Sequence, residues 1–272
     1  MDFKDIKVHW ESWAKAGVDL QATTKAATIK QLEIDALVRA MSLAEAEGTE
    51  RRVLEAGCGN GQNCVALARR FIQFNFDGFD YVDAMIASAE KLAVMGGVAD
   101  RTRFIIGDLR DPTTSDLAMS YDIVFTDRAI INLNSEELQL GSIAALATLV
   151  VRGGLFLLLE NFVETYDRQN DCREMLGLPR RSPAQYNLFL SCSRVELFVR
   201  NLGFDLIGID DFGSLHDLML YVLVPAVNEG SVDYDHPMVR VAADLSEKIS
   251  ARSPNSLGAF GQNRLYIFRK RA

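Results

Sequence analysis

The chain of 272 residues has few of the residues that hold disulfide-bonded or metal-stabilised folds together. It contains four cysteines, Cys58, Cys64, Cys172 and Cys192, and three histidines. No pair of these cysteines has the spacing of a metal-ligand motif. We therefore expect reduced thiols, no structural metal site and a cytoplasmic location.

Long apolar runs and an excess of basic charge are also missing. The longest apolar runs, near 143–151 and 218–227, are too short or too interrupted to cross a bilayer, and the N-terminus lacks the apolar core of a signal peptide. A formal net charge of −8 argues against phosphate-backbone binding as the main role. The chain is long enough for a full core, so we expect one globular protein with no membrane or nucleic-acid partner.

A short apolar stretch followed by a glycine-rich turn is the most informative feature of the sequence. Residues 53–56, Val-Leu-Glu-Ala, precede Gly57, Gly59 and Gly61, and apolar residues at helical spacing follow. This pattern predicts a strand, a turn and a helix. Alternating glycines let a ligand approach the backbone closely, and a helix start offers unpaired N–H groups. We expect the turn to hold a nucleoside-like cofactor.

The spacing of the glycines and the residue before them favour one class of cofactor. The dinucleotide fingerprint is G-x-G-x-x-G, whereas this turn is G-x-G-x-G and follows Glu55. A carboxylate there would repel a pyrophosphate and suit a cation. The stretch resembles the first motif of class I S-adenosylmethionine (SAM) methyltransferases, whose cofactor carries a sulfonium and an amino group. A nicotinamide-dependent oxidoreductase and a catalytically inert scaffold with the same fold are the alternatives.

Two further strand ends carry carboxylates in the order that this resemblance implies. The strand predicted at 74–80 ends in Asp80, 23 positions after Gly57, which suits a carboxylate that accepts from ribose hydroxyls. The strand at 103–106 is followed by Asp108, which in the methyltransferase pattern accepts from the adenine amino group. Together, the strand ends at 55–61, 80 and 108 indicate this family more specifically than any one of them alone.

The resemblance implies a Rossmann-like α/β fold: a seven-stranded, mostly parallel sheet with helices on both faces and an antiparallel last strand. It also implies a set of cofactor-binding residues at the strand ends. These are Glu55, Gly57, Cys58, Gly59, Gly61, Asp80, Tyr81, Met85, Asp108, Leu109 and Thr126.

The substrate is expected beside the end of the strand predicted at 121–126. Ligands of open α/β sheets bind outside the carboxyl ends of the strands, so Asp127, Arg128 and Asn132 should border it. The Asp/Asn-Pro-Pro motif of adenine-methylating enzymes is absent here, which disfavours a nucleobase as acceptor.

The acceptor is expected to be a small polar molecule with a hydroxyl, such as a sugar. The C-terminal half has a looser resemblance to methyltransferases of sugar or surface-polysaccharide biosynthesis. Arg128, Arg180 and Arg181 are candidates for binding an anionic group such as a phosphate. A solvated, purely surface role is the competing interpretation.

A hydroxyl acceptor requires a group that removes its proton. Histidine is the usual base near neutral pH, and His216 lies in the insertion that would cover the acceptor. Glu160, at the end of the fifth predicted strand, is the other candidate, and a structural role competes in both cases. We expect no catalytic metal, although carboxylates at strand ends keep a divalent cation conceivable.

The whole chain, 1–272, reads as one methyltransferase domain. Residues 1–47 form an N-terminal helical arm or lid, 48–160 the SAM-binding core, and 161–272 the substrate side with an insertion at 212–260. The segment 161–190 has little regular pattern. Asn134 and Glu137 resemble a capping box before the next helix.

Overall fold

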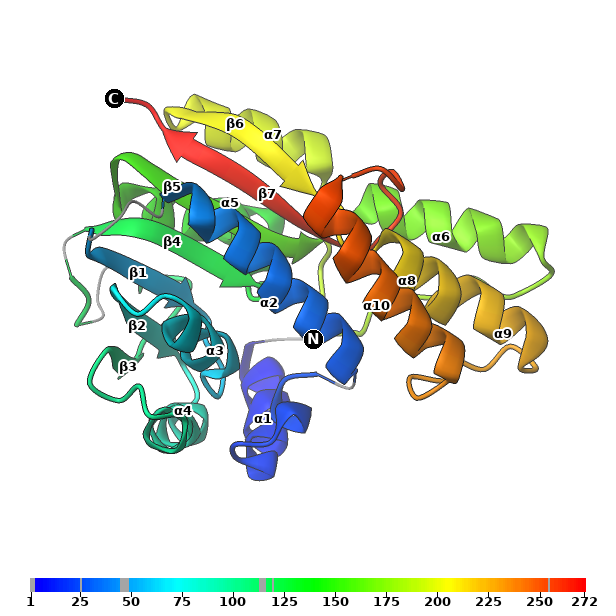
Figure 1. Ribbon diagram of the computed structural model, residues 1–272, viewed down its shortest axis with the longest axis horizontal. Helices are drawn as coiled ribbons and strands as arrows, with labels where there is room; N and C mark the ends of the chain where they lie inside the picture. Colours follow the sequence, from blue (N-terminus) through cyan, green and yellow to red (C-terminus); the bar gives the residue numbers. More distant parts are fainter. Residues whose placement is uncertain (1–2, 25, 45–48, 113–115, 119, 254) are drawn as a thin grey trace.

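A computed structural model describes residues 3–24, 26–44, 49–112, 116–118, 120–253 and 255–272 (Figure 1). The strands are β1 (Arg51–Ala56), β2 (Phe74–Asp80), β3 (Thr102–Ile106), β4 (Tyr121–Asp127), β5 (Val150–Asn161), β6 (Phe204–Asp210) and β7 (Asn263–Lys270). The longer helices are α1 (Phe3–Trp13), α2 (Ala27–Met41), α3 (Gln62–Arg70), α4 (Asp83–Gly96), α5 (Glu136–Thr148), α6 (Val163–Met175), α7 (Cys192–Asn201) and α10 (Pro237–Arg252).

The described strands form one sheet in the order β3-β2-β1-β4-β5-β7-β6. Neighbouring strands from β3 to β5 are parallel, and β7 is antiparallel to both β5 and β6. This confirms the predicted fold class. Because the carboxyl ends of parallel strands lie at one edge, the ends of β1, β2, β4 and β5 face the same space.

Alternate residues of the central strands belong to two separate cores, one on each face of the sheet. Ile123 and Phe125 pack with residues of α2 and α3, whereas Val124 packs with residues of α5 and α7. Burial on both faces explains why these strands read as continuous apolar runs. In Figure 1, α2 crosses one face of the sheet and α5 lies behind it.

The segment 161–190 shows little regular pattern in its sequence, yet its first half is helical. Residues Val163–Met175 form α6, a helix of 13 residues. The positions that α6 buries are mostly polar, so no apolar periodicity marks the helix in the sequence. They are Thr165, Tyr166, Gln169, Asn170 and Arg173.

A helix is also predicted after Ser214, ending before Pro225. The structure confirms a helical segment and rules out a strand, but its course is less regular. A short helix, α8 (Ser214–Leu218), is followed by a π-helical turn, η6 (Met219–Leu223), and by α9 (Val224–Val227). Pro225 lies in the first turn of α9 instead of after the helix. An unbonded N–H is normal in a first turn, so proline is accommodated there.

The N-cap of α5 differs from the prediction by one residue. Ser135, not Asn134, has the extended N-cap conformation, and its side chain accepts a hydrogen bond from the Leu138 N–H at 3.2 Å. The predicted boundary between the arm and the core, at 47/48, lies outside the described residues.

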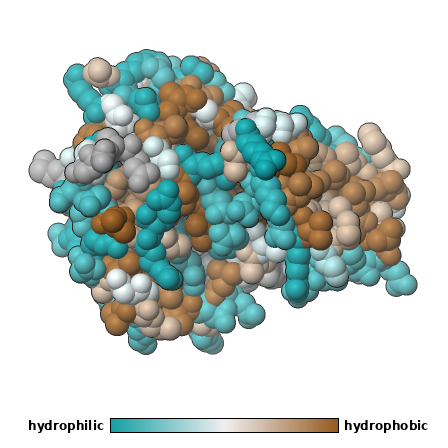
Figure 2. Space-filling model, viewed as in Figure 1, coloured by the Kyte–Doolittle hydropathy of each residue, from teal (hydrophilic) through white to brown (hydrophobic). Residues whose placement is uncertain are grey.

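The helices α6, α8, α9 and α10 form a lobe beyond the carboxyl edge of the sheet, at the right of Figure 1. Apolar side chains gather on the outer face of this lobe (Figure 2), and Met238, Val241 and Leu245 of α10 are each close to half exposed. None of the helices in the described ranges combines the length and apolar character that a membrane span needs.

Candidate active site

A cavity of about 320 Å³ lies at the carboxyl edge of the parallel strands, where the lobe meets the sheet. Most of the predicted site residues line it: Glu55, Gly57, Cys58, Gly59, Asp80, Tyr81, Met85, Leu109, Asp127, Arg128 and Asn132. Five predicted residues lie outside this lining: Gly61, Asp108, Thr126, Glu160 and His216.

The glycine turn is held tightly between its neighbours. The N–H groups of Gly57 and Cys58 both donate to the Phe79 carbonyl at 2.9 Å. Gly57 has a φ of +75°, and a Cβ there would lie 2.6 Å from the Cβ of Ala129. Gly61 also has a positive φ, but a Cβ there would meet Ala89 of α4 at 2.8 Å. Gly61 therefore serves packing against α4, whereas Gly57 keeps the turn close to the cavity wall.

Glu55 is buried beneath the turn. Its carboxylate accepts hydrogen bonds from the Asn63 amide at 2.7 Å and the Cys64 thiol at 3.0 Å. Burial raises the pKa of Glu55 to about 7, although these hydrogen bonds partly oppose the shift. The charge of this carboxyl group therefore changes near neutral pH.

Asp80 connects the end of β2 to the glycine turn. Its Oδ2 accepts from the Gly59 N–H at 3.0 Å and its Oδ1 from the Val82 N–H at 2.9 Å. Burial raises the pKa of Asp80 to about 6, and the backbone hydrogen bonds oppose this. Each carboxylate oxygen keeps a further lone pair for a ribose hydroxyl. The geometry fits the role predicted for this residue, and the role itself stays a prediction.

Asp108 does not line the cavity. Its carboxylate is bound by the Arg110 guanidinium, with Nε 3.0 and 2.9 Å from the two oxygens. Burial opposes the change, but the hydrogen bonds from Arg110 lower the pKa of Asp108. Leu109 and Tyr81 do line the cavity, and the Tyr81 hydroxyl is buried with no hydrogen-bond partner among the described residues.

The N-terminal arm closes the cofactor side of the cavity. The side chain of Asn60 donates to the carbonyls of Gly17 and Asp19, both at 2.9 Å, and Gln62 donates to Val18 at 2.8 Å. Trp10 and Trp13 pack with Tyr81 and Met85 in one apolar cluster. The arm therefore covers the turn directly.

A cluster of buried charges forms another wall. Lys30 lies 2.5 Å from Asp127 and 2.6 Å from Glu33, and Arg128 lies 3.0 Å from Glu33 and 3.4 Å from Asp127. Burial acts against each charge, but Lys30 and Arg128 lower the pKa of Asp127, and the two carboxylates raise the pKa of Lys30. The described residues contain no group of three or more His, Cys, Asp or Glu side chains suited to a metal ion.

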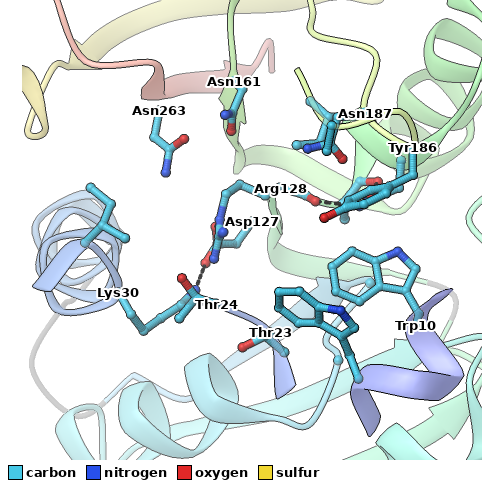
Figure 3. Close-up of a pocket in the computed structure, with 18 of the residues that line it drawn as sticks. Trp10, Thr23, Thr24, Lys30, Asp127, Arg128, Asn161, Tyr186, Asn187 and Asn263 are labelled. Atoms are coloured by element: carbon cyan, nitrogen blue, oxygen red, sulfur yellow. Dashed lines mark hydrogen bonds and ion pairs between the residues drawn. The ribbon is translucent and has the colours of Figure 1, made fainter. Parts of the chain in front are cut away.

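Several polar atoms at the lobe side of the cavity are buried without a hydrogen-bond partner among the described residues. Figure 3 shows Asn161, Asn187 and Asn263 converging on the space beside Arg128. Asn161 and Asn263 are directly opposite each other on β5 and β7. Among the unpartnered cavity-lining atoms are the side-chain oxygens of Asn132, Asn161, Asn187, Asn263 and Tyr166.

The two predicted bases lie behind the cavity wall. Glu160 Oε1 accepts from the N–H groups of Ala129 at 3.1 Å and Ile130 at 3.0 Å, and its Oε2 accepts from the Ile131 N–H at 3.4 Å. Burial raises the pKa of Glu160 to about 7, and these hydrogen bonds partly oppose the shift. His216 is fully buried, with Nε2 3.0 Å from the Thr28 hydroxyl and Nδ1 3.0 Å from Asp217. Of this group, Asp217 lines the cavity.

The three arginines expected to bind an anion have different surroundings. Arg128 is neutralised by Glu33 and Asp127. Arg180 is on the surface, within 3.1 Å of three carboxylates. Arg181, the next residue, lines the cavity.

Comparison with protein families identifies the central part of the chain. Residues 53–154, from β1 into β5, match the family model described as "Methyltransferase domain". This range contains the glycine turn and the strand ends described above. This part of the chain is a SAM-dependent methyltransferase domain of class I fold, and SAM is its cofactor. The nicotinamide-dependent and scaffold alternatives are thereby set aside.

Solved structures share the fold of this methyltransferase at low sequence identity. An O-methyltransferase family protein from Burkholderia thailandensis is 14% identical, with a TM-score of 0.60 over 99% of this chain and 63% of its own. The magnesium protoporphyrin IX methyltransferase of Synechocystis PCC 6803 with bound SAM is 15% identical, with a TM-score of 0.52 over 89% and 80%. A proposed sarcosine dimethylglycine methyltransferase from Galdieria sulphuraria is 13% identical, with a TM-score of 0.54 over 89% and 86%.

Sequence reasoning missed Lys30 and Glu33 of the charged wall and the asparagines Asn161 and Asn263. Lys30 and Glu33 are one helical turn apart on the buried side of α2, and charged residues on an otherwise apolar face are an available signal. Asn161 is the last residue of the apolar strand β5, and Asn263 is the first residue of the apolar strand β7. A polar residue at the end of an apolar strand is a second available signal of a site. Only the pairing of β5 with β7 shows that these two residues are neighbours.

Proposed function

We propose that this methyltransferase transfers the methyl group of SAM to a hydroxyl of a small polar molecule, such as a sugar. The observation that supports this is the shared cavity. The predicted cofactor residues Gly57 and Asp80 and the unpartnered oxygens of Asn161 and Asn263 line the same enclosed space. The volume, about 320 Å³, lies at the lower end of the range for small-ligand pockets.

The arm and the lobe favour a small acceptor over a macromolecule. His9 of α1 stacks on Tyr186 of the loop after α6, with ring centroids 4.0 Å apart. This contact joins the two covers of the cavity. A polymer would need both covers to open, whereas a metabolite fits inside, and no large basic surface is expected for a chain of charge −8.

The chain's own residues supply binding, alignment and a proton acceptor. Glu55 and Asp80 would hold the cationic and ribose parts of the cofactor, and the lone pair that remains on each oxygen of Asp80 fits that role. Bound SAM supplies an activated methyl group, and its transfer leaves S-adenosylhomocysteine. The proton of the acceptor hydroxyl would pass to the Asp217 carboxylate at the cavity wall.

His216 would position Asp217. A carboxylate only accepts hydrogen bonds, so the contact between His216 Nδ1 and Asp217 Oδ1 requires the proton on Nδ1. In the neutral ring, Nε2 then accepts from the Thr28 hydroxyl. This arrangement orients the carboxylate, which also accepts from Gln169 and from the Gln262 N–H.

Labelled methyl transfer tests the proposal. The protein is incubated with methyl-¹³C SAM and, separately, with a deproteinised metabolite extract, bulk RNA and bulk protein. We expect label in the small-molecule fraction, with the methyl carbon at the chemical shift of an ether. Label confined to RNA or protein, or a methyl bound to nitrogen, would contradict the proposed acceptor.

A further inference from the structure

Arg181 differs from the other cations of the cavity. Within the described residues, Lys30, Arg128 and Arg181 are the cations that line it. Lys30 and Arg128 are each paired with Glu33 and Asp127. The guanidinium of Arg181 instead donates to two neutral amide oxygens, on Gln169 and Gln262, both at 3.2 Å.

The surroundings of Arg181 leave its charge uncompensated. Its guanidinium lies over the ring of Tyr221 at 3.5 Å and near that of Tyr166 at 5.1 Å. Neither amide partner carries a negative charge, and no carboxylate is paired with Arg181 within the described part of the chain. The pKa of neighbouring Arg173 is lowered, first by burial and then by the positive charge of Arg181. A partly desolvated, unpaired guanidinium is costly, and a carboxylate or phosphate matches its fork of N–H donors.

Hydrogen-bond acceptors without partners among the described residues line the same cavity as this cation. Gln262, which holds Arg181, precedes Asn263, and Asn263 is opposite Asn161. The side-chain nitrogen of Asn263 donates to Glu33 at 2.6 Å, so the unpartnered atom is its oxygen. Asn161 and Asn263 are 4% and 3% exposed, and side-chain oxygens buried this deeply normally have hydrogen-bond partners. Hydroxyl groups of a ligand would satisfy them.

We propose that the acceptor is an anionic polyol: Arg181 binds its carboxylate or phosphate, and Asn161 and Asn263 accept hydrogen bonds from its hydroxyls. The proposal rests on the proposed function, since it describes the acceptor in the same cavity. Arg181 is then the residue that selects a charged acceptor over its neutral analogue.

The chain provides a matched control in the preceding residue. Arg181→Gln removes the guanidinium in the cavity, Arg181→Lys keeps a positive charge without the fork, and Arg180→Gln removes a guanidinium that is paired on the surface. Each variant and the wild type are incubated with labelled SAM and a deproteinised metabolite extract of the source organism. Products are separated by anion exchange at pH 8, with and without phosphatase treatment. SAM affinity is measured separately by calorimetry.

We expect the labelled product to bind the anion exchanger. Arg181→Gln should raise the apparent KM for the acceptor, from an extract dilution series, about tenfold or more. The apparent KM of Arg181→Lys should lie between those of the wild type and Arg181→Gln, and that of Arg180→Gln should match the wild type. All variants should bind SAM with equal affinity. Retention lost after phosphatase identifies a phosphate, and retention that persists identifies a carboxylate.

Four outcomes would overturn the inference. A neutral or cationic labelled metabolite excludes an anionic acceptor while leaving the proposed function intact. Weaker SAM binding by Arg181→Gln assigns the guanidinium to the cofactor. An unchanged acceptor KM in Arg181→Gln removes Arg181 from recognition. Label only in RNA or protein defeats the proposed function itself, and the inference with it.

Discussion

Replacement of Asp80 by alanine tests the cofactor side of the cavity directly. The carboxylate is 9% exposed, and each oxygen holds one backbone N–H, from Gly59 at 3.0 Å and Val82 at 2.9 Å. Hydrogen bonds to a charged group contribute about 1.5–3 kcal/mol. Loss of the ribose acceptor should therefore weaken SAM binding about 10- to 100-fold. Isothermal titration at a pH well above 6 measures this with the carboxylate ionised.

The control is Asp77, three residues earlier on the same strand. Its carboxylate binds Arg103 and the Tyr121 hydroxyl and does not line the cavity. Asp77→Ala should leave the SAM dissociation constant unchanged, and Asp80→Asn should restore part of the loss because one acceptor oxygen is kept. An unaltered dissociation constant in Asp80→Ala would show that the ribose binds elsewhere.

The pH dependence of the same residue gives an independent check. The pKa of Asp80 is raised from 3.8 to about 6. Protonation removes the charged acceptor, so wild-type SAM affinity should fall as the pH drops through about 6, and Asp80→Asn should lack this step. The contribution of Asp80 to stability has the opposite sign: it is fully present below pH 3.8 and is lost as the pH rises through about 6.

Three more predictions concern buried charges. The pKa of Glu55 is raised from 4.5 to about 7, so wild-type affinity for cationic SAM should strengthen as the pH rises through 7. The SAM affinity of Glu55→Gln should lack this step. The unfolding free energy of the wild type relative to Glu55→Gln should fall as the pH rises through the same range. His216→Ala should lower kcat about 10²-fold or more and shift the pH profile of kcat, while SAM affinity stays constant. His216→Asn should recover part of the lost kcat. Full activity of His216→Ala would exclude the Asp217–His216 pair from proton removal. Lys30→Met leaves two buried carboxylates short of a partner and should lower the unfolding free energy by about 3–5 kcal/mol in denaturant titrations, whereas Lys7→Met, in an exposed pair with Glu11, should change it by less than about 0.5 kcal/mol.

The parallel half of the sheet was predictable because its signals are local. Phe74–Asp80 is predicted and observed with the same bounds, since an apolar alternating run ends in a carboxylate and a helix start. The mostly parallel sheet and its antiparallel last strand followed from the family resemblance. The side chains that face the cavity from these strand ends, such as Glu55 and Asp80, were predictable for the same reason.

The lobe side was less predictable because its contacts are remote in sequence. Gln169 meets Asp217 and Phe260, and Arg181 meets Gln262, so this wall is assembled from four separate segments. The helix α6 buries polar residues against these partners, which removes the apolar periodicity that reveals a helix. Arg180 and Arg181 look equivalent in the sequence, and only the fold directs one to the surface and the other to the cavity.

The buried charges on the wall are better explained by ligand positioning than by stability. Lys30, Glu33, Asp127 and Arg128 are two cations and two carboxylates, and the side chains of the first three are at most 6% exposed. Such a cluster rarely stabilises a fold more than apolar residues of the same size would. Its members nevertheless fix other groups: Glu33 holds the Asn263 amide, and Asp127 and Glu55 both accept from Asn63. The same hydrogen bonds therefore orient the glycine-turn carboxylate and an acceptor-side asparagine, which aligns the two halves of the cavity before any ligand binds.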